Sequence, residues 1–383
     1  MVTDSRRRTS GTTGLVLQPQ APLSPGFRDA VAAAVAAFCA EQTETLAAMG
    51  PELASVRDLA LELLRGGKRL RPAFCVWGYV AAAGLPGSAS GADLAALLRA
   101  AGSLDLLHVS ALVHDDVMDG SDLRRGRPAA HRQFEAQHRA ADALGDAAAF
   151  GRAGAILLGD LLVMWSVEML QRSGLPAAAL ERAAPLAQAM RTEVTCGQFL
   201  DIIAQAQPLR EDPGRALDEA ERVVEFKSAR YTVQRPAQLG AALGGGTGRL
   251  LADLAAYGSP LGRAFQFRDD VLGVFGDSEV TGKPAGDDLR EGKRTVLVAH
   301  AYAHARPAGR SLLATRLGDP GLTAAGVADL QQVIVDSGAR EAVETMIEQA
   351  YQRALAALDR AEMTPEGRQG LTALAEAAVR RES

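Results

Sequence analysis

Apolar residues recur every three or four positions along almost the whole chain from Phe27 onward, in segments rich in Ala, Leu, Glu and Arg. This spacing puts the apolar side chains on one face of an α-helix, and no window shows the two-residue alternation that is typical of a strand. Glycine- and proline-rich breaks, such as 66–67, 120–128 and 276–286, leave roughly a dozen segments of helical length. The pattern therefore predicts an all-α fold.

No linker, composition shift or fixed-period repeat divides these helices, although 383 residues would by length alone suggest about two or three domains. We therefore predict one all-helical domain over residues 27–383. Residues 1–26 differ, because they contain an Arg run at 6–8 and prolines at 19, 22 and 25. Such a composition buries too little apolar surface to fix its backbone, so a disordered N-terminal tail is predicted over 1–26.

Composition narrows the class of protein further. A net charge of −5 gives no general attraction for nucleic acid or an anionic membrane. The three cysteines share no metal-ligand spacing, which suits reduced thiols in a cytoplasmic protein. The longest uncharged N-terminal run, 30–40, is too short to span a bilayer and lacks signal-peptide flanks. We therefore expect a cytoplasmic protein with no stable membrane insertion and no nucleic-acid partner.

Two aspartate clusters end long apolar segments, one at 115–119 and one at 269–270. The C-terminal end of a helix carries partial negative charge, so carboxylates gathered there are unfavourable unless a cation joins them. Asp115 and Asp119 are four residues apart and share a helix face, with Cβ atoms about 5–6 Å apart. Carboxylate oxygens at this spacing suit a hard divalent cation such as Mg²⁺.

Two basic segments stand beside these acids in the sequence. Lys68, Arg69 and Arg71 follow a double glycine where a helix is expected to begin, a combination that can seat a diphosphate. Arg124 and Arg125 follow the first acid cluster directly, and paired guanidinium groups match phosphate oxygens. Each segment alone could also be ordinary solvated surface.

Lysine is rare in this chain, and the few lysines fall near these segments. Of 41 basic residues only four are lysine: Lys68, Lys227, Lys283 and Lys293. A compact ammonium group can approach a phosphate oxygen where a flat guanidinium does not fit. Chance within an arginine-rich composition is the alternative explanation.

Five blocks in order, from about Leu61 to Val298, resemble the trans-isoprenyl diphosphate synthases, also called polyprenyl synthetases, and most of all bacterial geranylgeranyl diphosphate synthases. They read GGKRLRP, LLHVSALVHDDVMD, RRGRPAAH, GQFLD with FKSAR, and FQFRDDVLGVFGD continuing into TGKPAGDDLREGKRT. The resemblance implies an isoprenoid synthase-type helical bundle around a deep central cavity. The two aspartate clusters would then face each other across its mouth.

The resemblance also implies roles for single residues. The expected magnesium ligands are Asp115, Asp119 and Asp269, supported by Asp116 and Asp270. The expected isopentenyl diphosphate-binding residues are Lys68, Arg71, His108 and Arg125. The expected allylic diphosphate-binding residues are Arg124, Lys227, Ser228, Gln266, Lys283 and Lys293. Gln198, Asp201 and Asp287 match further positions near the phosphates. The acids and Lys227 form the expected catalytic set.

Two positions depart from the family pattern. The second cluster ends in Gly273 where a last aspartate is common, and Ser228 stands where threonine is common. We expect activity to survive, because the first aspartate of that cluster is the expected ligand and Ser228 keeps the hydroxyl group. His114, beside the first cluster, is either an orienting residue or a satisfied core histidine.

The reaction implied is a Mg²⁺-dependent condensation of isopentenyl diphosphate with an allylic diphosphate, by a homodimer. Small Ser110 and Ala111, one turn or slightly more before Asp115, should leave a product tunnel open, with Leu107 at its floor. Other floor candidates are Leu104, Met164 and Trp165. The predicted product is geranylgeranyl diphosphate, and a longer polyprenyl product is the first alternative. A class I terpene cyclase, a non-catalytic partner subunit and a helical scaffold protein are the other hypotheses.

Overall fold

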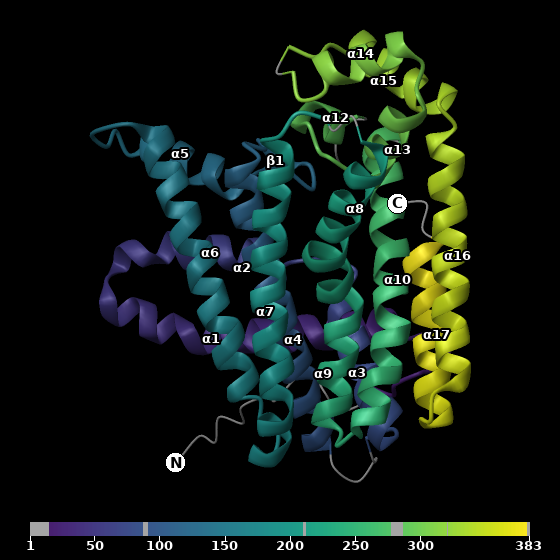
Figure 1. Cartoon of the computed structure of the whole chain (residues 1–383). Coiled ribbons are helices and arrows are strands. Elements are labelled where there is room, and N and C mark those ends of the chain that lie inside the picture. The colour runs from purple at the N-terminus through teal and green to yellow at the C-terminus, as the bar shows by residue number, and fades with distance from the viewer. Residues whose placement is uncertain (1–14, 87–90, 210–211, 277–285, 320, 381–383) are drawn as a thin grey trace, which may run out of the picture.

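The computed structural model describes residues 15–86, 91–209, 212–276, 286–319 and 321–380, and these residues are almost entirely helical (Figure 1). The all-α prediction is confirmed. The helices are α1 (Pro25–Met49), η1 (Pro51–Leu53), α2 (Ala54–Leu63), α3 (Leu70–Ala83), α4 (Gly91–Met118), α5 (Ala130–Ala140), α6 (Ala147–Gln171), α7 (Ala177–Gln205), α8 (Pro213–Val223), the π-helix η2 (Val224–Gln234), α9 (Arg235–Leu243), α10 (Gly248–Phe275), α12 (Asp287–Glu291), α13 (Val296–His304), α14 (Pro307–Arg316), α15 (Ala324–Asp336), α16 (Ala339–Arg360) and α17 (Pro365–Val379). Two short strands, β1 (Leu123–Arg124) and β2 (Arg127–Pro128), pair antiparallel after α4.

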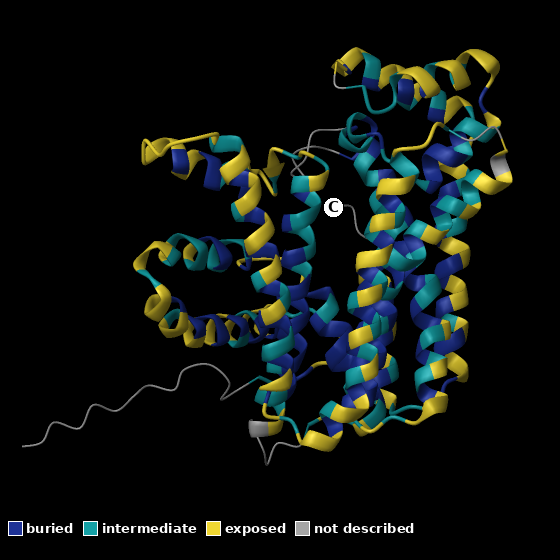
Figure 2. Cartoon of the chain, turned by 60° about the vertical axis from the view of Figure 1, so that its left-hand side comes forward, coloured by how far each residue is buried: buried dark blue, intermediate teal, exposed yellow. Residues whose placement is uncertain are grey.

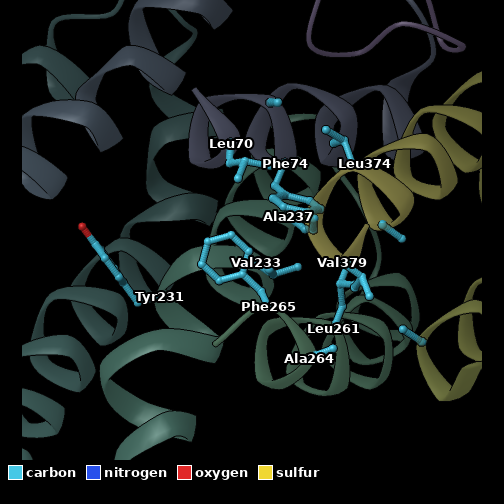
Figure 3. Close-up of a cluster of buried hydrophobic side chains, with 14 of the residues drawn as sticks. Leu70, Phe74, Tyr231, Val233, Ala237, Leu261, Ala264, Phe265, Leu374 and Val379 are labelled. Atoms are coloured by element: carbon cyan, nitrogen blue, oxygen red, sulfur yellow. The ribbon is translucent and has the colours of Figure 1, made fainter. Parts of the chain in front are cut away.

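Long helices run side by side through the body of the molecule, and α4 lies between two apolar clusters (Figures 1 and 2). Leu104 and Leu107 of α4 belong to the larger cluster, which α3, α7, α9, α10, α16 and α17 also build. Figure 3 shows part of it, with Phe74 of α3, Phe265 of α10 and Leu374 of α17 among the side chains drawn. Leu106 of α4 belongs to the second cluster, with side chains of α1, α2, α5 and α6. Burial on both sides fixes the direction of α4, and hence the position of the acids at its end.

Glycines let α3 and α9 pack backbone to backbone. A Cβ added at Gly78 would overlap the backbone of Ala237, and one added at Gly240 would overlap the carbonyl of Cys75. Since α9 continues directly from η2, this contact holds the basic start of α3 at a fixed place relative to η2. Overpacking of such a contact is destabilising by about 1–3 kcal/mol.

Part of the predicted disordered tail is packed instead. Residues 1–14 lie outside the described residues, but Leu17 is only 7% exposed, and Leu15 and Leu23 pack against the larger cluster. Ser24 caps α1 by accepting a hydrogen bond from Phe27 N at 3.3 Å. The prediction of disorder was wrong for 15–26, because three apolar side chains are enough to hold this proline-rich segment against a core that other helices build.

Among the described residues, two helices are long and apolar enough to cross a membrane by length and composition: Asp93–Met118 within α4 and Ala147–Gln171, which is α6. The apolar window of α4 is 78% buried, as expected for a core helix. That of α6 is only 44% buried. Phe150, Leu157 and Met164 are consequently exposed apolar side chains along α6.

Candidate functional site

The first acid cluster lies where the end of α4 meets α7 and η2. Asp115 Oδ1 accepts hydrogen bonds from Gln198 Nε2 at 2.8 Å and from Lys227 Nζ at 3.3 Å. Lys227 Nζ also donates to Asp201 Oδ2 at 2.5 Å. Three helices distant in sequence therefore meet at one carboxylate, and the sequence-predicted residues Gln198, Lys227 and Asp201 all lie there.

Arg124 holds the other face of the cluster. Its Nε donates to Asp116 Oδ1 at 2.9 Å, and its Nη2 lies 3.8 Å from Asp115 Oδ2. The short β1–β2 hairpin positions this side chain, because Arg124 pairs with Arg127 across it. Asp116 is 3% exposed, so its role in the structure is to orient Arg124 rather than to face solvent.

Asp119 lies close to the segment that follows α12. Lys293 Nζ lies 3.7 Å from Asp119 Oδ2, 3.5 Å from Asp288 Oδ1 and 2.6 Å from Glu291 Oε2. Glu291 also accepts a hydrogen bond from Ser121 Oγ at 2.9 Å. Lys293 thus joins the end of α4 to α12, and the predicted contact of Lys293 with a phosphate stays a prediction.

The charges of the acid cluster are only partly balanced. Burial raises the pKa of Asp115, but Lys227, Lys293 and Arg124 outweigh it, so this pKa lies below its usual range. Burial and the neighbouring Asp115 raise the pKa of Asp119 to about 6. Asp119 Oδ2 is buried and has no hydrogen-bond partner. A buried carboxylate in this state gains from a further cation, so the pair Asp115 and Asp119 fits a hard divalent ion.

The second acid cluster lies on α10. Asp269 is half-buried, whereas Asp270 is 3% exposed and accepts a hydrogen bond from Gln266 Nε2 at 2.8 Å. Burial raises the pKa of Asp270 well above its ordinary value, and Asp288 and Asp269 raise it further. Among the described residues no three His, Cys, Asp or Glu side chains are grouped closely enough to hold a metal ion by themselves.

A carboxylate takes the space of the missing aspartate in the second cluster. A Cβ at Gly273 would overlap the carboxylate of Asp288, the residue that also contacts Lys293. Asp288, which the sequence analysis did not single out, therefore lies beside α10 next to the sequence-predicted Asp287.

The basic segment before α3 forms a second charged site, which we call the seat and which comprises Lys68, Arg71, His108 and Arg125. Gly66 and Gly67 adopt positive φ angles of 76° and 91°, which only glycine accepts without strain. A Cβ at Gly67 would lie 3.6 Å from Arg125 Nη2, so Arg125 covers this turn. Arg71 Nη2 donates to Thr232 Oγ1 at 2.9 Å, and its guanidinium lies 4.3 Å from the centroid of the Tyr231 ring.

His108 lies among the cations of this seat. Burial lowers its pKa well below the ordinary value, and Arg71, Arg125, Arg124 and Arg69 lower it further. Burial and the neighbouring Arg124 and Arg69 likewise lower the pKa of Arg125. Like charges gathered this closely are unfavourable without an anion, so the seat suits a diphosphate. Lys68 is exposed at its edge.

Tyr231 and Thr232 were missed by the sequence analysis, although both contact Arg71. Tyr231 is 4% exposed, its ring centroid lies 6.3 Å from that of His108, and its hydroxyl has no hydrogen-bond partner. Figure 3 shows the hydroxyl pointing away from the apolar cluster. Both residues follow Lys227 on η2. The sequence pattern did not predict that this segment is a π-helix, and this winding determines which side chains after Lys227 reach Arg71.

Three glycines hold η2 in place. A Cβ at Gly197 of α7 would overlap the backbone of Lys227, and Cβ atoms at Gly258 and Gly262 of α10 would overlap Gln234 and Ala229. Because η2 packs closely against the backbones of α7 and α10, its position is fixed. Lys227 therefore reaches Asp115 while Tyr231 and Thr232 reach Arg71. One element thus connects the acid cluster to the basic seat.

Three further sequence-predicted residues are Ser228, Lys283 and His114. Ser228 is half-buried next to Lys227, and Lys283 lies outside the described residues. His114 turns toward α6, where Nε2 lies 3.1 Å from the carbonyl oxygen of Ile156 and 3.3 Å from Asp160 Oδ1. It therefore does not orient the acid cluster.

The expected tunnel residues do not share one helix face. Successive residues turn by about 100°, so Ala111 lies near the line of Asp115 whereas Ser110 lies about 140° away. Leu107 is buried in the larger cluster. Two other floor candidates lie apart from Leu107. Met164 is 64% exposed, and Trp165 packs against Phe38 in the second cluster.

Comparison with known proteins gives a consistent result. Residues 54–334 match the family model described as Polyprenyl synthetase. The crystal structure of geranylgeranyl pyrophosphate synthase from Corynebacterium glutamicum, complexed with isoprenyl diphosphate and magnesium, is similar with a TM-score of 0.87 and 41% identity, covering 93% of this chain and 98% of that one.

Curated relatives differ in the product that their names state. The geranylgeranyl diphosphate synthase of Methanosarcina mazei is 34% identical over 62% of this chain and 64% of its own length. The octaprenyl diphosphate synthase of Escherichia coli is 30% identical over 83% of this chain and 87% of its own length. The chain therefore spans somewhat less than two thirds of the Methanosarcina relative.

If the acid pair needs a further cation, Mg²⁺ added with inorganic pyrophosphate should raise the thermal unfolding midpoint, because a ligand that binds only the folded state stabilises it. Asp119→Asn should abolish most of this rise in a differential scanning fluorimetry series. The control Asp160→Asn, which changes a half-exposed acid beside His114, should retain it. An equal rise in wild type and Asp119→Asn would exclude Asp119 from the cation site.

Proposed function

Because the chain belongs to the polyprenyl synthetase family of trans-prenyltransferases, we propose that it condenses isopentenyl diphosphate with an allylic diphosphate in a Mg²⁺-dependent reaction, with geranylgeranyl diphosphate as its main product. The observation that carries this proposal is the pair of separate charged sites joined by η2. Lys227 contacts Asp115 of the acid cluster at one end of η2, and Tyr231 and Thr232 contact Arg71 of the seat at the other end.

Two separate sites favour condensation over the competing functions. A class I terpene cyclase binds one diphosphate and has no use for the seat around His108. A non-catalytic partner subunit would lack acids or cations of the site, but both aspartate clusters and the basic seat are present in this chain. A helical scaffold protein gives no reason for buried, unbalanced charge at either site.

We assign the seat of Lys68, Arg71, His108 and Arg125 to isopentenyl diphosphate. Burial and the neighbouring arginines lower the pKa of His108, and we assign this residue as a hydrogen-bond donor to a phosphate oxygen rather than as a catalytic base. Arg71 and Arg125 supply the positive charge. Tyr231, whose buried hydroxyl has no partner, closes the seat beside Arg71.

The acid cluster and its lysines are assigned to the allylic diphosphate. Asp115, Asp119 and Asp269 would hold Mg²⁺, which when bound supplies positive charge that stabilises the departing diphosphate. Lys227, Arg124 and Lys293 are already fixed at this place by Asp115, Asp116 and Glu291. We include Ser228, Gln266 and Lys283 in the allylic site on family resemblance.

The chemistry balances without a protein base. The allylic C–O bond breaks and its electron pair leaves with the diphosphate, so the allylic fragment becomes a carbocation. The double bond of isopentenyl diphosphate forms the new C–C bond to this cation, and a proton then leaves to the released diphosphate. The apolar side chains below Asp115, with Leu104 and Leu107 among them, exclude water that would quench the cation.

Product length would be set along α4 below Asp115. Ala111 is the small residue near the line of Asp115, and one helical turn of about 5.4 Å is roughly one isoprene unit. The Corynebacterium structure at 41% identity bears the name of a geranylgeranyl synthase and supports that product. A longer product is the alternative, supported by the octaprenyl relative.

We further propose that the protein is a cytoplasmic homodimer paired through α6. Leu157 and Met164 are 68% and 64% exposed and lie seven residues apart on one face of the helix, with Phe150 and Ile156 nearby. Exposed apolar side chains gathered on one side of a helix, here with the charged Asp160 among them, are typical of an association surface. A second copy is the occupant that the family resemblance implies.

Incubation of the protein with Mg²⁺, isopentenyl diphosphate and farnesyl diphosphate should give geranylgeranyl diphosphate in product chromatography. Asp115→Ala should lower kcat by about a hundred-fold or more with the fold retained by circular dichroism, because it removes charge stabilisation in the transition state. No product from the wild type, or near-normal turnover of the variant, would contradict the proposal.

Ala111→Phe should shorten the main product, since an aromatic ring on this face would block the path below Asp115. Product chain lengths are compared after incubation with dimethylallyl diphosphate, and the rate of the first condensation serves as the internal control. An unchanged product distribution would place the floor of the tunnel on another helix.

Leu157→Arg should convert the dimer to a monomer, because a charge would enter the apolar face of α6. Molar mass is measured by light scattering after gel filtration. Val335→Arg, on the 37% exposed position of α15, is the control and should leave the mass unchanged. A dimeric Leu157→Arg protein, or a monomeric wild type, would refute the α6 interface.

A further inference from the structure

A buried ion pair lies directly behind the basic seat. Arg69 Nη1 donates to Asp105 Oδ2 at 2.8 Å, and the two side chains are 5% and 8% exposed. Arg69 Nη2 donates to the carbonyl oxygen of Leu64 at 2.9 Å. Neither group is turned toward the space that a substrate would occupy, since both ends of the guanidinium are used within the protein.

This pair joins three separate elements. Leu64 is the C-cap of α2, Arg69 is the N-cap of α3, and Asp105 lies in the middle of α4. Asp105 is also one turn before His108, so the two side chains lie on the same side of α4. The pair therefore sets the distance between the start of α3, which carries Lys68 and Arg71, and the part of α4 that carries His108.

The backbone of this turn depends on such a tie. Gly66 and Gly67 have positive φ angles, and Arg69 itself has φ 55°, a left-handed conformation that is uncommon for a residue with a side chain. No side chain caps the start of α3. A strained conformation persists only where the surrounding structure imposes it, and here the guanidinium anchored in the core does so.

We infer that Arg69 and Asp105 are positioning residues for isopentenyl diphosphate, an inference that rests on the proposed function. Their ion pair fixes Lys68 and Arg71 opposite His108 without touching the substrate. The allylic site is fixed by other contacts, namely those of Asp115 with Gln198 and Lys227. Loss of the pair should therefore affect one substrate and spare the other.

Asp105→Asn tests this inference and separates it from a simple charge effect. The substitution removes a negative charge near the seat, so electrostatics alone would tighten the binding of a diphosphate. Loss of position acts in the opposite direction. We expect KM for isopentenyl diphosphate to rise by about ten-fold or more, with KM for farnesyl diphosphate within about two-fold of wild type.

Two further variants make the test decisive. Arg69→Lys keeps the charge but cannot bind Asp105 and Leu64 together, so it should raise the same KM to a smaller extent even if Asp105→Asn does not fold. Glu41→Gln breaks a more exposed pair with Arg99 of α4, whose two hydrogen bonds are both 2.7 Å, and should change neither KM.

The outcomes distinguish this inference from the proposed function. An unchanged or lowered KM for isopentenyl diphosphate in both variants, or equal rises in both KM values, would overturn the positioning role while leaving prenyl transfer intact. A wild-type protein that condenses no substrate would instead refute the proposed function, and the positioning role with it.

Discussion

Charge that is only partly balanced inside an apolar bundle is the constraint on which the rest of this structure depends. At the end of α4, Asp119 keeps a buried oxygen without a hydrogen-bond partner, and around His108 several arginines approach one another. Neither arrangement is favourable alone, since burial penalises each charged group. The large apolar core supplies the free energy that holds them in place, and bound ligands of opposite charge would relieve both.

The helices surrounding these charges are arranged to keep them apart from each other. Arg124 and Lys227 lie with the acids, whereas Arg71 and Arg125 lie on the side of α3. Glycine contacts between backbones, at Gly197 against η2 and at Gly240 against α3, leave little freedom for these elements to shift. Rigid spacing of this kind is what a reaction between two highly charged substrates requires.

The helical fold and several residues of the charged sites could be predicted from the sequence, because they depend on local sequence patterns. Helical periodicity predicted the all-α fold. The family resemblance assigned Lys227 and Lys293 to the site of the first aspartate cluster, and in the structure Lys227 contacts Asp115 while Lys293 contacts Asp119. Tertiary partners could not be predicted in this way. The contact of Asp288 with Gly273 of α10 is an example, because it depends on how α12 packs against α10. The packed segment 15–26 escaped prediction for the same reason, since its few apolar residues are stabilised by a core built elsewhere.

The π-helical winding of η2 has a consequence for how this chain can vary. Removing one residue from a helix rotates every later side chain about the helix axis, so a deletion within η2 would turn its later side chains in another direction. Lys227 could then reach Asp115 only if Tyr231 and Thr232 lost Arg71, or the reverse. Substitutions can be absorbed one at a time along this segment, but a change of its length cannot, because the spacing from Lys227 to Thr232 matches the distance between Asp115 and Arg71.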